Sequence, residues 1–157
     1  MGMAPGQRAR VAVGLGATCA TIGAASLLAG SGTAVADPNA VLAQINDDRA
    51  AGGCGPLTMN GRLVAAAQRH ADDLASSGAV SHSGGDGSTV GSRIQDAGYA
   101  AGGWAENIYR GGGDPVSGWM NSPGHRQNML NCSYTEAGLA QSGGGDMTYY
   151  VADFASP

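Results

Sequence analysis

Two long stretches of the chain carry apolar residues at helical spacing, and each is bounded by residues that start and stop helices. The first follows Asp37-Pro38, a capping side chain with proline at the first helical position, and should end at Gly52-Gly53. The second follows Asn60, repeats apolar residues on one face, and should end at Gly78. The pattern therefore predicts two amphipathic helices in the first half of the domain.

Shorter elements fill the second half. Ser88, Asp114-Pro115 and Ser122-Pro123 each resemble a helix start, so three short helices are predicted. The stretches 138–142 and 147–155 favour two strands, joined by a glycine-rich hairpin at 143–146. Helices first and a hairpin last, without a βαβ rhythm, predict an α+β fold in which helices pack around a small antiparallel sheet.

The N-terminal residues have the pattern of an export signal. Arg8 and Arg10 precede an apolar, Ala- and Gly-rich run at 11–28, and Ala34-Val35-Ala36 is a small-residue cleavage site. We therefore expect residues 1–36 to be a secretory signal peptide and residues 37–157 to be a single domain, secreted or associated with the cell envelope. A membrane anchor is the alternative, but the run is weakly hydrophobic and no stop-transfer charges follow it.

The charge composition of the chain disfavours some classes of binding partner. The whole chain contains no lysine, and the part after residue 36 keeps six arginines against twelve acids, a net charge of −6. Such an acidic domain is a poor ligand for nucleic acid or for anionic lipid headgroups. We expect a monomer that binds no nucleic acid and has no stable membrane anchor.

Two cysteines, Cys54 and Cys132, remain after the predicted cleavage. In an exported chain an even number of cysteines favours a disulfide. Two metal-binding thiolates are the alternative, but the paired spacing of zinc sites is missing. We therefore predict a Cys54–Cys132 bridge.

The residues that could carry chemistry are few. The sequence has no G-x-S-x-G nucleophile elbow and no lysine for a phosphate-binding loop. His82, Glu106 and His125 remain, and two imidazoles with one carboxylate match the ligand types of an open zinc site. His125 falls in the first turn of its predicted helix, where the positive helix end disfavours the imidazolium form. His70 is interpreted as a half-buried structural histidine.

Glu106 supports two interpretations. It lies among apolar residues, and a buried carboxylate must be paired, hydrogen-bonded or bound to a cation. Alternatively, it faces water from the edge of a strand.

Several motifs in order resemble one known family. They are HS at 82–83, ENI at 106–108, WMNSPGHRQNML at 119–130, EAGLA at 136–140 and YYVADF at 149–154. As a set they resemble the CAP superfamily (cysteine-rich secretory, antigen 5, pathogenesis-related 1), in its short bacterial SCP-domain form. The resemblance implies an α-β-α sandwich with a central cleft, in which two His and two Glu bind a divalent metal in some members.

By this resemblance His82 and His125 correspond to the two histidines, and Glu106 to the first glutamate. Ala105 replaces a glycine that usually precedes that glutamate, and the second glutamate has no counterpart, with Ser122 near its place. Zinc or magnesium on His82, Glu106 and His125 is thus an expectation with the fourth ligand missing.

The resemblance also implies a function. We expect a non-catalytic extracellular module that binds a lipid, sterol, cell-envelope or host ligand at a His- and Glu-lined cleft. A metal-dependent hydrolase or peptidase using His82, Glu106 and His125 is the first alternative. A hydrogen-bonded structural network of the same three residues, without any ligand, is the second.

Overall fold

The computed structural model describes residue 2 and residues 36–157. The predicted signal peptide, residues 1–36, therefore lies almost entirely outside the described residues. The described part contains five α-helices, four strands and one short 3-10 helix. They are α1 Pro38–Ala51, β1 Thr58–Met59, α2 Gly61–Ser77, α3 Val90–Asp96, β2 Gly103–Arg110, α4 Pro115–Met120, α5 Pro123–Met129, β3 Glu136–Ser142, η1 Gly145–Met147 and β4 Tyr149–Ser156.

The four strands form one sheet in the order β1-β3-β4-β2. β3 and β4 are the predicted hairpin, and β4 also pairs antiparallel with β2. β1 adds a parallel pairing to β3, which makes the sheet mixed where the sequence predicted an antiparallel one. A two-residue strand has no periodicity from which it could be recognised.

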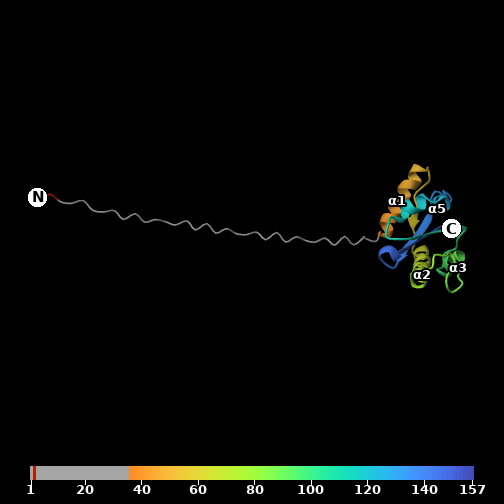
Figure 1. Cartoon of the computed structure of the whole chain (residues 1–157). Coiled ribbons are helices and arrows are strands. Elements are labelled where there is room, and N and C mark those ends of the chain that lie inside the picture. The colour runs from red at the N-terminus through yellow and green to blue at the C-terminus, as the bar shows by residue number, and fades with distance from the viewer. Residues whose placement is uncertain (1, 3–35) are drawn as a thin grey trace. The chain divides into compact units, whose positions relative to one another are not determined.

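Helices cover both faces of this sheet, so the predicted sandwich of helices around a sheet is confirmed. α2 and α3 pack on one face, and α1, α4 and α5 pack on the other (Figure 1). Every residue of β4 from Tyr149 to Ala155 is consequently buried. This double burial explains why the strand reads as a nearly continuous apolar run.

Three of the helix starts form as the sequence predicts. The side chains of Asp37, Asn60 and Asp114 accept hydrogen bonds from backbone N–H groups in the first turns of α1, α2 and α4. α2 ends at Gly78, whose positive φ of 71° is the left-handed conformation that glycine favours.

The other two helix starts differ from the prediction. α3 is capped by Thr89 and not by Ser88, because Thr89 and Ser92 form a reciprocal capping box. Ser122 precedes α5 at the predicted position but makes no side-chain capping bond.

Gly138 lets α2 approach the sheet very closely. A Cβ added at this position of β3 would overlap the backbone carbonyl group of Leu63. The helix and the strand therefore meet backbone to backbone, an approach that only glycine allows.

We expect Gly138→Ala to lower the free energy of unfolding by about 3 kcal/mol, because the methyl group forces α2 away from the sheet. Gly61→Ala is the control, since a Cβ at Gly61 meets no atom within 4 Å. Denaturant unfolding monitored by circular dichroism measures both. A Gly138→Ala protein as stable as the wild type would contradict the close approach.

The predicted bridge between Cys54 and Cys132 is present. Their Cα atoms are 4.9 Å apart, and the two residues are separated by 78 positions in the chain. The bridge joins the loop after α1 to the segment after α5. It therefore closes most of the domain into one loop.

Replacing both cysteines by serine should lower the free energy of unfolding by about 4 kcal/mol, since the unfolded chain regains the entropy of a long open loop. Urea unfolding of the double variant under oxidising conditions measures this loss. Intact mass under non-reducing conditions should show two hydrogens fewer than the reduced wild type. A mass equal to that of the reduced chain would contradict the bridge.

Candidate functional site

Glu106 is the centre of the candidate site. It lies in β2, with its side chain 1% exposed, and its Cα pairs with that of Asp153 in β4. Asp153 in turn pairs with Gly138 in β3, so these three residues share the sheet face that α2 covers. The interpretation that Glu106 is buried and paired is confirmed, and the water-facing alternative is wrong.

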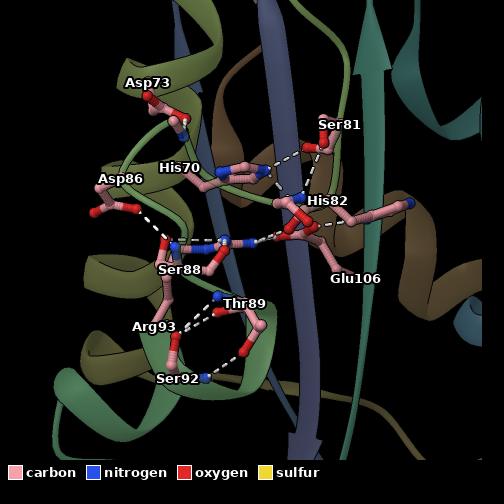
Figure 2. Close-up of polar contacts among 12 residues, drawn as sticks. His70, Asp73, Ser81, His82, Asp86, Ser88, Thr89, Ser92, Arg93 and Glu106 are labelled. Atoms are coloured by element: carbon pink, nitrogen blue, oxygen red, sulfur yellow. Dashed lines mark hydrogen bonds and ion pairs between the residues drawn. The ribbon is translucent and has the colours of Figure 1, made fainter.

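Each oxygen of the Glu106 carboxylate has its own partner. His82 Nδ1 lies 2.7 Å from Oε1, and Arg93 Nη2 lies 2.8 Å from Oε2 (Figure 2). The Arg93 side chain, like that of Glu106, is 1% exposed. The carboxylate is therefore held between an imidazole and a guanidinium group within the protein interior.

The contact with Glu106 fixes the orientation of the His82 ring. A carboxylate only accepts hydrogen bonds, so His82 Nδ1 carries the hydrogen and donates it to Oε1. In the neutral ring Nε2 is then the acceptor. The His82 side chain is 58% exposed, so this acceptor belongs to the part of the site that a ligand can reach.

His70 lies close to Glu106 and is wholly buried. Its Nε2 donates to the backbone oxygen of Ser81 at 2.7 Å and lies 3.8 Å from Glu106 Oε1. It is thus bonded to a neighbour as the structural interpretation expects, although its exposure is 0% and not half. Through Ser81, His70 holds the backbone next to His82.

Asp153 adds a second buried acid to the same face of the sheet. Its exposure is 0%, and neither carboxyl oxygen has a hydrogen-bond partner among the described residues. Burial, together with the negative charge of Glu106, raises the pKa of Asp153 well above its ordinary value. Asp153 and Glu106 are thus two buried acids side by side, and Arg93 is the cation that contacts them through Glu106.

His125 lies on α5, beyond the edge strand β2. Its backbone oxygen accepts a hydrogen bond from Asn107 at 2.9 Å, and Asn128 of the same helix donates to Asn107 Oδ1 at 2.8 Å. Burial lowers the pKa of His125, and the charge of His82 lowers it further. The lowered pKa agrees with the sequence expectation of a neutral ring, and its largest cause is burial.

An open groove of about 450 Å³ lies beside His82. Its volume falls within the range of about 300–1,000 Å³ that is typical of small-molecule sites. Trp104 is 46% exposed there, and its indole packs so closely on Gly91 of α3 that an added Cβ would be 3.2 Å from the ring. The groove is lined by His82, Ser83, Thr89, Val90, Trp104, Ala105, Glu106 and Asn128.

A larger groove lies elsewhere on the domain. It has a volume of about 840 Å³ and is lined by residues of α4 and α5 and by the segment that ends at Cys132. None of His82, Glu106 and His125 lines it. Volume alone therefore does not identify the site, whereas the groove beside His82 is lined by two of the three candidate residues, His82 and Glu106.

The model of one protein family, the cysteine-rich secretory protein (CAP) family, matches residues 42–154. The chain belongs to this family. No curated protein sequence matches the chain significantly.

Solved structures of bacterial proteins show the same fold. An extracellular protein containing an SCP domain from Bacillus anthracis is 28% identical, with a TM-score of 0.66, over 76% of this chain and 41% of that one. An outer surface protein from Borrelia burgdorferi is 20% identical, with a TM-score of 0.69, over 75% of this chain and 90% of that one. A cysteine-rich secretory protein from Staphylococcus aureus is 24% identical, with a TM-score of 0.62, over 76% and 38%.

These similarities concern the CAP domain. The chain spans less than half the length of the Bacillus and Staphylococcus proteins. Among the described residues, no helix is both long enough and apolar enough to cross a membrane.

The contacts of Glu106 do not favour a metal ion held by His82, Glu106 and His125 together. Both oxygens of Glu106 are engaged, by His82 and by Arg93. Within residues 36–157, no group of three or more His, Cys, Asp or Glu side chains is arranged to hold a metal ion. The metal role of the three residues stays a prediction from the resemblance, and the geometry does not favour it.

Sequence reasoning missed Arg93 and Asp153. Arg93 lies three residues after Val90 and one before Ile94, so the helical spacing itself places it on the buried face of α3. Asp153 interrupts the apolar run of β4, and a lone acid in a strand buried on both faces needs a reason. The helical spacing of Arg93 and the position of Asp153 within an apolar run could both have been read from the sequence.

We expect His82→Ala to raise the pKa of His125, because the positive charge that His82 contributes is removed. A pH titration of the His125 ring by NMR measures this pKa. Ser83→Ala is the control, since it alters the groove next to His82 without removing a charge. An unchanged or lower pKa in His82→Ala would show that the two rings are not electrostatically coupled.

Proposed function

We propose that this CAP domain is a secreted, non-catalytic module that binds a lipid, sterol or other cell-envelope ligand in the groove beside His82 and Trp104. The observation that carries the proposal is the composition of the groove. Trp104, Val90 and Ala105 supply apolar surface, while His82, Ser83 and Asn128 supply polar groups. A ligand with an apolar body and a polar end suits such a lining.

The hydrogen-bond partners of the polar side chains in the groove favour binding over catalysis. His82 is oriented by a buried carboxylate, as a general base is. However, among the described residues no hydroxyl or thiol group is hydrogen-bonded to His82. Thr89, one of the two groove hydroxyls, accepts from the backbone of Ser92 and so caps α3. A nucleophile paired with its base is therefore not assembled.

The proposed export is compatible with the start of the fold. Asp37, the first residue after the proposed cleavage, is itself the N-cap of α1. Removal of residues 1–36 thus leaves the first helix whole. The similarity to an extracellular protein from Bacillus anthracis and an outer surface protein from Borrelia burgdorferi supports the same location.

Vesicles of phosphatidylcholine and phosphatidylethanolamine, prepared with and without cholesterol, test the proposal. Trp104 is exposed and Trp119 is 1% exposed, so a blue shift of tryptophan emission on titration reports burial of Trp104. We expect this shift to persist in EDTA and in His125→Ala. Cosedimentation should show binding reduced about tenfold or more by Trp104→Ala, because the main apolar contact is lost.

Met147→Ala is the matched control. Met147 is 47% exposed, similar to Trp104, but lies in η1 and does not line the groove. Its removal should leave vesicle binding unchanged. No binding to any of these vesicles, or equal loss in both variants, would contradict a lipid or sterol site in the groove.

A further inference from the structure

Arg93 is a buried cation that bonds both Glu106 and the loop of His82. Its Nη2 donates to Glu106 Oε2 at 2.8 Å and to the backbone oxygen of His82 at 3.1 Å. Its Nη1 donates to the backbone oxygen of Ser88 at 3.3 Å. The guanidinium therefore neutralises Glu106 and also holds the loop that carries His82 (Figure 2).

Arg93 supplies the positive charge that a buried carboxylate requires and that a metal ion could otherwise supply. A buried carboxylate needs a positive partner, and Glu106 has Arg93 on one oxygen and His82 on the other. A divalent ion bound directly by Glu106 would stand next to this buried guanidinium, where the two positive charges repel each other.

We propose that Arg93 takes the place of a divalent metal in this site, so that the cleft is built and held without one. Arg93 is then a positioning residue: it holds Glu106, and Glu106 fixes the tautomer and orientation of His82. The positive charge that stabilises the carboxylate is part of the chain itself. Removing that charge should leave a site that zinc can enter.

Arg49 provides a matched comparison. It too is 1% exposed, but its hydrogen bonds go to the backbone oxygens of Gly55, Met129, Asn131 and Tyr134 and not to a carboxylate. Loss of either arginine removes a buried side chain and several hydrogen bonds. Only loss of Arg93 leaves a carboxylate without its cation.

Calorimetric titration of the purified wild type with zinc is the first test. We expect no saturable binding with a Kd tighter than about 100 µM. We also expect the same melting temperature in EDTA, in zinc and in magnesium. Low-micromolar zinc binding that is lost in both His82→Ala and Glu106→Gln would overturn the proposal.

Substitution of Arg93 is the second test. In Arg93→Gln, zinc should raise the melting temperature and bind at least about tenfold more tightly than to the wild type, and His82→Ala should abolish this gain. Arg93→Lys keeps a cation and should remain independent of zinc. Arg49→Gln should melt earlier than the wild type but gain nothing from zinc.

A folded Arg93→Gln protein that gains no zinc affinity would overturn the proposal. If Arg93→Gln does not fold, the wild-type titration and the Arg93→Lys variant still test the proposal. Zinc dependence in either protein would contradict an internal cation. Nitrogen NMR of the His82 ring adds a readout that loss of stability alone does not move. The Nδ1–H tautomer should persist in EDTA, in Arg93→Lys and in Arg49→Gln.

The metal titration tests the internal cation, and the vesicle experiment tests the proposed ligand class, so either proposal can be refuted without the other. Vesicle binding by a zinc-dependent protein would refute the internal cation and leave the proposed ligand class intact. A zinc-independent protein that binds no vesicle would support the internal cation and refute the proposed ligand class.

Discussion

The buried ion pair between Arg93 and Glu106 is the interaction on which the rest of the site depends. Both side chains are 1% exposed, so neither charge has water to stabilise it. Removing one partner of such a pair typically costs about 3–5 kcal/mol, because the other charge is left uncompensated. This contact joins α3 to β2, and further bonds of the same two side chains hold the loop before α3 and orient the His82 ring.

The sheet explains why this pair lies inside the protein. Glu106, Asp153 and Gly138 are cross-strand neighbours on the face that α2 covers. Two acids side by side in an apolar interior would repel each other if both were charged. The neighbouring charge of Glu106 therefore adds to burial in raising the pKa of Asp153, while the guanidinium of Arg93 opposes this rise and pairs with Glu106.

Local signals predicted the fold well, while the site required contacts between distant parts of the chain. The helix starts at Asp37, Asn60 and Asp114 depend on side chains that bond their own first turn, so the sequence alone identifies them. The start of α3 was misplaced by one residue, because Ser88 and Thr89 are both good caps and only the bond to Ser92 distinguishes them.

The pairing of His82 with Glu106 could not be derived from spacing. The two residues are 24 positions apart, and the register between β2 and β4 decides which face Glu106 occupies. Resemblance to the CAP family supplied this pair. It did not supply Arg93, whose importance depends on a partner 13 residues away that no periodic pattern specifies.

The absence of a side chain at Gly138 also determines how close two parts of the site lie. Because α2 meets β3 backbone to backbone there, the two backbones alone fix the distance between helix and sheet. His70 on α2 lies 3.8 Å from Glu106 on the sheet across this interface. A side chain at position 138 would therefore separate the buried histidine from the carboxylate that orients His82.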